Sequence, residues 1–142
     1  MAGDEKTGYW LFKQEPECYS YADLERDGRT VWDGVTNSLA QKNLRQVRVG
    51  DCILFYHTGK QKAVVGEMVV VSGPRPASDG DRHVVVEVEP VRRLLAVTLE
   101  QIKADALLRD WDLVRLPRLS VVPMTPAQWQ RVHEVSGTGR AE

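Results

Sequence analysis

Three short segments of the sequence place polar side chains directly beside aromatic rings. They are Lys13-Gln14-Glu15, residues 32–37 (Trp-Asp-Gly-Val-Thr-Asn) and Tyr56-His57-Thr58. Aromatic rings offer faces on which a flat heterocycle stacks, while amide, carboxylate and imidazole groups form directed hydrogen bonds. An unstacked nucleobase requires this combination, and stacking contributes roughly 1–3 kcal/mol per base. The three segments therefore indicate a base-binding pocket.

Each of these side chains also has an ordinary structural interpretation. Trp32 suits a hydrophobic core as well as a pocket wall, because large rings carry much apolar area. Asn37 can end a turn, and Lys13 can pair with the neighbouring Glu15. From the residues alone, both interpretations stay open.

The sequence lacks the motifs of common enzyme classes. It contains no GxGxxG, Walker loop, HExxH or GxSxG pattern. Cys52 and His57 stand five positions apart on a predicted strand, so their side chains point to opposite faces. Cys18 and Cys52 form no CxxC pair, which indicates reduced thiols and no zinc site. We expect no catalysis, no cofactor and no metal; an enzyme with Asp33 or His57 as general base is a third hypothesis.

The charge of the chain is balanced overall and uneven locally. Among 142 residues, 19 Lys and Arg face 20 Asp and Glu, a net charge of −1, which excludes a globally basic nucleic-acid coat. Residues 38–62 hold five basic side chains against Asp51 alone, a net of +4. From this segment Lys42, Arg45 and Lys60 are predicted to steer a phosphate backbone. The alternative is a solvated helix face and a loop tip.

Local patterns predict a small α+β domain, because the length fits one domain and strands and helices alternate. Predicted strands cover residues 9–13, 52–56, 63–71 and 83–88, with Pro90 ending the last and a further strand at 91–95. Residues 72–80 are predicted to be a loop. Helices are predicted after Ser20 and after three capping boxes, Ser38 with Gln41, Thr98 with Gln101 and Thr125 with Gln128.

Several motifs, in order along the chain, resemble the EVE domain family. The first is residues 9–16, Tyr-Trp-Leu-Phe-Lys-Gln-Glu-Pro, and the second is residues 30–37. The third joins Val-Gly-Asp at 49–51 to Phe-Tyr-His at 55–57, and Arg-Leu-Ser-Val at 118–121 follows. The resemblance spans roughly residues 8–135, and the family includes the thymocyte nuclear protein group and many small bacterial members.

The resemblance implies a PUA-like fold, a curved mixed β-sheet or pseudo-barrel flanked by helices, related to the YTH readers of methylated adenine. It also implies a non-catalytic pocket for a modified nucleobase. Trp32 looks like the counterpart of a tryptophan in the YTH aromatic cage. By the same matching, the residues that line or rim the pocket are Lys13, Gln14, Asp33, Asn37, Tyr56 and His57.

This chain departs from the family pattern at two places. The family commonly has Ser at the position of Gln14, and Arg-Asn-Tyr where residues 36–38 are Thr-Asn-Ser. The loss of a planar cation and a ring is expected to weaken phosphate contact or to alter which base fits.

Our leading hypothesis is a reader of a methylated or otherwise altered base in DNA or RNA. Trp32 would stack on the base with Tyr56 as a second wall, and Trp32→Ala is expected to remove the preference while the fold survives. The alternative is a binder of a small free nucleoside-like metabolite without polymer contact. We expect a monomer with no membrane partner, and a small molecule or buffer ion could occupy the pocket.

The domain is predicted to cover residues 8–136, between a short tail at 1–7 and a frayed tail at 137–142. Eukaryotic members of the family tend to carry a basic segment before the domain. Here Lys6 is the only basic residue before the first motif. A bacterial cytoplasmic protein is therefore expected, or a nuclear one if the source is eukaryotic.

Overall fold

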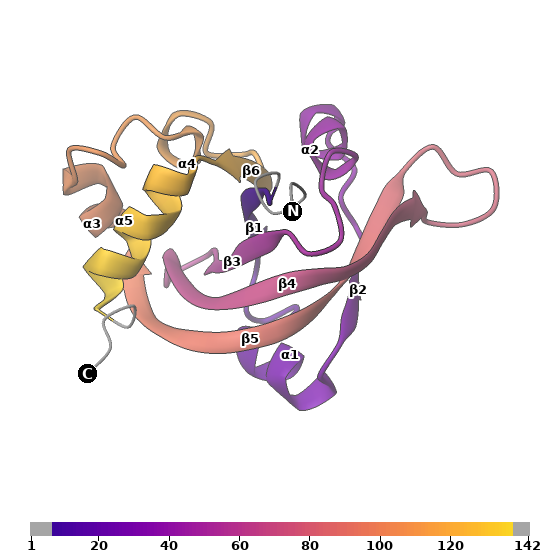
Figure 1. Cartoon of the computed structure of the whole chain (residues 1–142), viewed down its shortest axis with the longest axis horizontal. Coiled ribbons are helices and arrows are strands. Elements are labelled where there is room, and N and C mark those ends of the chain that lie inside the picture. The colour runs from indigo at the N-terminus through magenta and orange to yellow at the C-terminus, as the bar shows by residue number, and fades with distance from the viewer. Residues whose placement is uncertain (1–6, 138–142) are drawn as a thin grey trace.

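The computed structural model describes residues 7–137, which form one curved, mixed six-stranded sheet with five helices (Figure 1). The strands are β1 (Tyr9–Gln14), β2 (Thr30–Trp32), β3 (Cys52–His57), β4 (Ala63–Pro76), β5 (Val84–Thr98) and β6 (Val121–Met124). The helices are α1 (Tyr21–Asp27), α2 (Ser38–Leu44), α3 (Leu99–Ala104), α4 (Asp112–Arg115) and α5 (Pro126–Ser136). The strand order is β2-β5-β4-β3-β1-β6, so the sheet does not close into a barrel.

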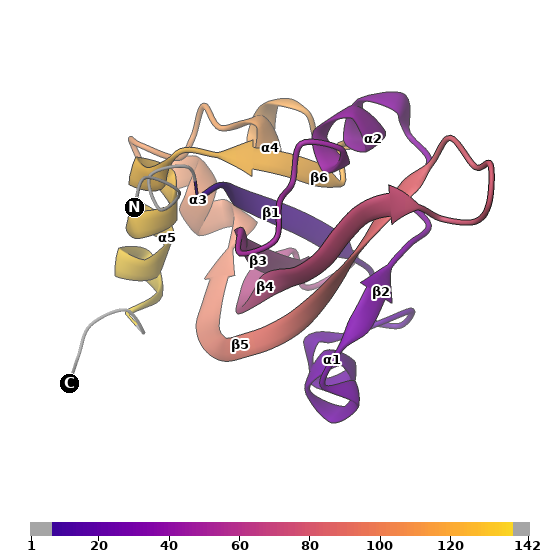
Figure 2. The same cartoon turned by 45° about the vertical axis from the view of Figure 1, so that its right-hand side comes forward.

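The parallel pairing of β1 with β3 brings two of the predicted polar segments together. Within the described residues the pair runs in register from Tyr9 opposite Cys52 to Gln14 opposite His57. Since the strands are parallel, their carboxyl ends meet at one edge of the sheet. The backbone N–H of Thr58 extends the pairing by donating to the Gln14 carbonyl at 3.0 Å. Figure 2 shows the two strands inside the curve of the long β4–β5 hairpin.

A buried carboxylate fixes the other end of this parallel pair. Asp51 is 3 % exposed and accepts three hydrogen bonds, each 2.9 Å long. The donors are the backbone N–H groups of Gly8 and Arg48 and the indole Nε1 of Trp10. Hydrogen bonds to an ionised group are among the stronger ones, and here they offset the cost of burying the charge.

Helix α1 is held against the sheet by Tyr21. Its ring meets Phe55 edge-on at 5.5 Å, and its hydroxyl lies 2.6 Å from the Glu67 carbonyl oxygen. A Cβ at Gly66 would overlap the ring, so this position in β4 requires glycine. The close approach places α1 directly over the β4–β5 pair.

Helix α5 is held by an ionic network on β4 and β5. The two ring nitrogens of His133 face the Trp129 carbonyl oxygen at 2.8 Å and the Glu67 carboxylate at 3.1 Å. Both partners are hydrogen-bond acceptors, and the His133 ring bridges them between α5 and β4. Arg92 also pairs with Glu67, at 3.1 Å. Burial opposes the charge of Glu67, but the hydrogen bonds from His133 and Arg92 outweigh it and hold the pKa of Glu67 below its ordinary value.

The outer edge of β6 is covered by side chains. Asn43 Nδ2 donates to the Val121 carbonyl oxygen at 2.8 Å, and Trp111 Nε1 donates to the Pro123 carbonyl oxygen at 3.0 Å. These bonds attach α2 and the segment before α4 to the edge strand.

The structure confirms the predicted α+β class and three caps, at Ser20, Thr98 and Thr125. The prediction that Ser38 caps a helix is wrong, because Asn37 is the cap and the Gln41 side chain instead bonds the Val35 carbonyl at 2.6 Å.

The ends of the long strands also differ from the prediction. Strand β4 continues through residues 72–76, and β5 continues through Pro90. The proline is tolerated because the register shifts beside it, between Glu67 and Met68 of β4, where a ladder N–H is not required. Strand β6 and helix α4 were not anticipated from periodicity because each has only four residues. Most of the two predicted tails, residues 1–6 and 138–142, lies outside the described residues.

We predict that Asp51→Asn lowers the free energy of unfolding by about 2–4 kcal/mol, because an amide NH₂ would face N–H donors that the carboxylate now satisfies. Urea denaturation at neutral pH measures this. Asp110→Asn, which changes an exposed side chain, is the control and leaves the midpoint in place. Wild-type stability in Asp51→Asn would contradict the role given to this carboxylate.

We also predict a pH dependence from Glu67. Because its folded pKa is depressed, its contribution is present above the ordinary value of 4.5 and is lost as the pH falls through the lower folded pKa. Glu67→Gln should lower stability at pH 7 by about 1–3 kcal/mol and flatten the acid limb of the stability curve. Denaturation across the acid range tests this, with the exposed Glu100→Gln as control. An unchanged acid limb in Glu67→Gln would refute it.

Candidate functional site

Two hollows lie at the two ends of the segment that joins β2 to α2. The first, the Gln14 hollow, has a volume of about 330 Å³ and is lined by Gln14, Cys18, Tyr19, Thr30, Val31, Trp32 and Asp33. The second, the Asn37 hollow, has a volume of about 400 Å³ and is lined by Asn37, Leu39, Arg115, Leu116, Pro117, Arg118 and Leu119. Asp33 and Asn37, four residues apart, thus border different hollows.

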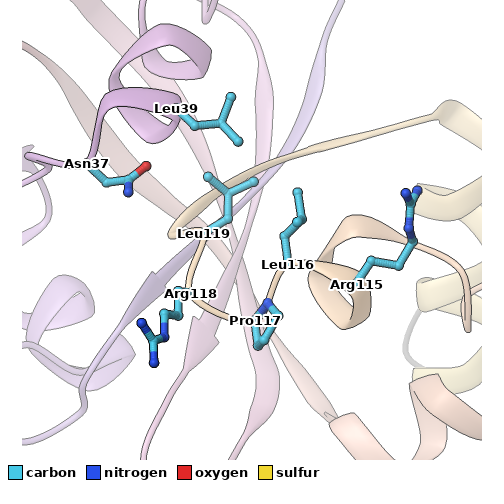
Figure 3. Close-up of a pocket in the computed structure, with 7 residues that line it drawn as sticks. All are labelled: Asn37, Leu39, Arg115, Leu116, Pro117, Arg118 and Leu119. Carbon is cyan, nitrogen blue, oxygen red and sulfur yellow. The ribbon is translucent and has the colours of Figure 1, made fainter.

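The Asn37 hollow has an apolar floor and charged margins (Figure 3). Leu39 on α2 faces Leu119 from the segment that precedes β6. The guanidinium groups of Arg115 and Arg118 point away from the leucines, on opposite sides. Arg115 pairs with Asp112 at 3.5 Å, whereas Arg118 has no acidic partner within residues 7–137. The hollow thus combines an apolar surface with a cation, Arg118, that has no acidic partner among the described residues.

Trp32 belongs mostly to the core. Its side chain is 4 % exposed and packs against Phe12 at 5.5 Å and, edge-on, against Phe55 at 5.3 Å. Only a small part of the indole surface therefore reaches the Gln14 hollow. The expectation that the fold survives Trp32→Ala conflicts with this packing, because removing a buried tryptophan costs about 3–5 kcal/mol.

Gln14 and Asp33 give the Gln14 hollow its free polar groups. Gln14 Oε1 accepts from the Glu15 backbone N–H at 2.9 Å, which leaves the amide NH₂ to donate. Asp33 is exposed, and within residues 7–137 its carboxylate has no hydrogen bond or ion pair. The Tyr19 hydroxyl, in contrast, donates to Asp27 at 2.8 Å. The hollow thus presents one free amide donor beside one free carboxylate acceptor.

Lys13 lines neither hollow but contacts a residue that lines the Asn37 hollow. Its ammonium donates to the Pro117 carbonyl oxygen at 2.8 Å and lies 5.8 Å from the centre of the Tyr56 ring. Burial lowers the pKa of Lys13 and raises the pKa of Tyr56 to about 12. Tyr56 is 4 % exposed and lines neither hollow. The predicted second aromatic wall therefore lies beneath Lys13 instead of opposite Trp32.

At the same sheet edge, His57 joins β3 to α1 and to the β3–β4 turn. Nε2 accepts from the Tyr21 backbone N–H at 3.1 Å, so Nδ1 carries the proton and donates to Gln61 Oε1 at 2.7 Å. Both nitrogens are engaged, which leaves none to act as a general base. His57, like Tyr56, is absent from the lining of both hollows.

The two polar atoms of the Asn37 side chain differ in their roles. Its Oδ1 accepts from the Ala40 backbone N–H at 3.0 Å and caps α2. Its NH₂ group has no partner within the described residues and borders the Asn37 hollow. Asn37 can therefore cap the helix and donate to a ligand at once.

The predicted backbone-steering residues separate into two places. Lys42 and Arg45 lie on or beside α2, and Arg45 reaches the Arg82 carbonyl oxygen at 2.9 Å across a small hollow. Lys60 lines a different hollow, at the turn between β3 and β4. Sequence reasoning missed Arg82 and Arg118, which are distant in the chain; the only signal was that Arg118 opens the motif at 118–121.

Neither a metal cluster nor a membrane-spanning helix occurs within residues 7–137. No group of three or more His, Cys, Asp or Glu side chains there is arranged to hold a metal ion. None of the helices in that range is long and apolar enough to cross a membrane.

Comparisons with known proteins find one family and several solved relatives. The family model described as EVE domain matches residues 8–135. Thymocyte nuclear protein 1 of rat is 28% identical over 164 residues, which cover 89% of this chain and 73% of the relative. A crystal structure from Agrobacterium tumefaciens is 33% identical with a TM-score of 0.88, covering 92% of this chain and 94% of the other. Human thymocyte nuclear protein 1, in complex with DNA containing 5-methylcytosine, is 25% identical with a TM-score of 0.82, covering 96% and 100%.

We predict that Asn37→Ala lowers the free energy of unfolding by about 1 kcal/mol through loss of the cap, whereas Asn37→Asp, which keeps an acceptor oxygen, leaves it nearly unchanged. Thermal or urea denaturation distinguishes the two variants. Equal stability of both variants would show that the Oδ1 bond does not support α2.

Proposed function

Because the chain belongs to the EVE domain family, we propose that it binds DNA and accepts a modified base, with 5-methylcytosine the first candidate, without performing chemistry on it. Human thymocyte nuclear protein 1, solved with DNA that contains this base, aligns with 96% of the chain. That alignment supports the choice of ligand, and the residues of the two hollows support a binding role.

The observation that carries the proposal is the pair of free polar groups in the Gln14 hollow. The Watson–Crick edge of cytosine presents an amino donor beside a ring-nitrogen acceptor. The Asp33 carboxylate only accepts, and the Gln14 amide has only its NH₂ group free. A cytosine that leaves its stack would direct its amino group to Asp33 and its N3 to Gln14. Thymine would place a carbonyl oxygen against the carboxylate and be rejected.

The methyl group contributes less than the polar edge. Val31, 38 % exposed, gives the hollow an apolar surface beside the small accessible part of Trp32. At ~25 cal/mol per Å², burying one methyl is worth somewhat under about 1 kcal/mol, or less than about fivefold in affinity. Preference for 5-methylcytosine over cytosine is therefore expected to be modest.

Basic side chains around α2 would hold the phosphates next to the base. Lys42, Arg82 and Arg118 have no acidic partner within residues 7–137. Each phosphate contact of this kind adds affinity that falls with salt concentration. These residues take the place of the family arginine that is Thr36 in this chain.

The alternative function is binding of a free nucleoside-like metabolite. The net charge of −1 and the Thr at position 36 favour it, because both reduce attraction to a polymer. Salt dependence separates the two functions: affinity for a neutral nucleoside hardly changes with salt, whereas affinity for DNA or RNA falls steeply.

For the compartment we propose the bacterial cytoplasm. The bacterial structure from Agrobacterium tumefaciens shares 33% identity with this chain and the rat relative 28%, which supports a bacterial setting. A eukaryotic source would place the domain in the nucleus.

We predict that Asp33→Asn weakens binding to a duplex with one 5-methylcytosine by roughly tenfold or more, since a charge-assisted hydrogen bond is replaced by an amide that also donates. Fluorescence anisotropy with the modified duplex, its cytosine and thymine counterparts and the matching RNA measures this. Asp79→Asn, an exposed change in the β4–β5 loop, is the control. The proposal would fail if wild type bound modified and unmodified DNA with equal affinity. It would also fail if Asp33→Asn bound the modified duplex as tightly as wild type does.

A further inference from the structure

A third concave surface lies at the turn between β3 and β4. This lysine hollow has a volume of about 430 Å³ and is lined by Lys60, Gln61, Lys62, Thr98, Leu99, Glu100 and Lys103. It combines the β3–β4 turn with the start of α3. None of its residues lines the Gln14 or Asn37 hollow.

The three lysines are not neutralised by the protein. Within residues 7–137, the cationic partner in every ion pair is an Arg or a His. Lys60, Lys62 and Lys103 have no such partner, although Glu100 lines the same hollow. Gathering like charges around one concavity raises their energy, and a bound anion relieves it.

The turn that carries Lys60 and Lys62 is hydrogen-bonded both to α3 and to β3. The Leu99 backbone N–H donates to the Lys62 carbonyl oxygen at 2.8 Å, which joins the turn to α3. Gln61 accepts from His57 Nδ1 at 2.7 Å, which joins it to β3. Lys62 has a φ of +46°, a left-handed conformation that non-glycine residues adopt only when the surroundings impose it. The backbone that carries Lys60 and Lys62 is thus fixed before any ligand arrives.

The same turn begins next to the Gln14 hollow. His57 is paired with Gln14 across the parallel strands. Lys60 lies three positions after His57, a span of at most about 11 Å between Cα atoms. Phosphates close to a base in the Gln14 hollow therefore come within reach of the turn.

We propose that the lysine hollow holds backbone phosphates of the nucleic acid whose modified base enters the Gln14 hollow. The inference rests on the proposed function for its ligand and adds a second contact region. Lysine ammonium groups act on phosphates as mobile point charges, so this region contributes affinity and no base preference.

The test is the double variant Lys60→Gln with Lys103→Gln, which leaves Lys62 and its backbone conformation in place. Affinity for the modified and the unmodified duplex is measured across a salt series. The slope of log affinity against log salt should fall in magnitude by up to about 0.9 for each phosphate contact removed, about 2 in all. Both duplexes should lose affinity by the same factor, so that their ratio is unchanged.

The matched control is Arg48→Gln with Arg109→Gln, which removes the same charge from two exposed positions outside every hollow described here. Thermal denaturation confirms that both variants fold. A wild-type slope in the lysine variant, or an equal loss in the control, overturns the inference. If wild type binds the modified and the unmodified duplex equally, only the proposed base pocket is overturned, because the salt slopes still report on the lysines. Absence of any duplex binding by wild type overturns both.

Discussion

The buried carboxylate of Asp51 sets the position of the candidate site from the opposite end of the sheet. Its three N–H donors come from both strands of the parallel pair: Gly8 just before β1, Trp10 within β1, and Arg48 before β3. Strands β1 and β3 then run for six residues each without a bulge between them. A slip of one residue would turn Gln14 to the other face of the sheet. The register fixed at Asp51 therefore decides what the far edge presents.

Around the hollows, backbone N–H groups occupy the side-chain acceptor atoms, and side-chain donors remain free for a ligand. The side-chain oxygens of Gln14 and Asn37 accept backbone N–H groups, so the NH₂ group of each remains free. His57 has no free nitrogen, and Lys13 already donates to a carbonyl. Asp33 carries the one carboxylate among the predicted site residues, and it has no hydrogen bond or ion pair within residues 7–137. Such a surface suits the ligand proposed above, because a cytosine nucleotide is rich in acceptors and carries one prominent donor.

The sequence predicted features that depend on neighbours along the chain. The capping boxes at Thr98 and Thr125 were predicted correctly because both partners lie within three residues. The box at Ser38 failed because Gln41 finds partners on Val35 and, across space, on Val84. The net charge of residues 38–62 likewise led us to predict one phosphate-binding set of Lys42, Arg45 and Lys60. The fold places Lys60 apart from the other two. The burial of Trp32 depends on rings from β1 and β3, and periodicity within β2 cannot reveal them. Of the three polar segments, the pairing of β1 with β3 brings two, at Gln14 and His57, to one edge of the sheet.

An open sheet has two free edges, at β2 and β6, where a strand of another molecule could add. Strand β2 has only three residues, which is too short to template a long ladder. On β6, the Asn43 and Trp111 side chains already occupy the Val121 and Pro123 carbonyl oxygens, and Pro123 has no N–H to offer. Neither β2 nor β6 offers a long row of free backbone groups to a neighbouring chain, so the contacts that cover β6 also disfavour strand addition there.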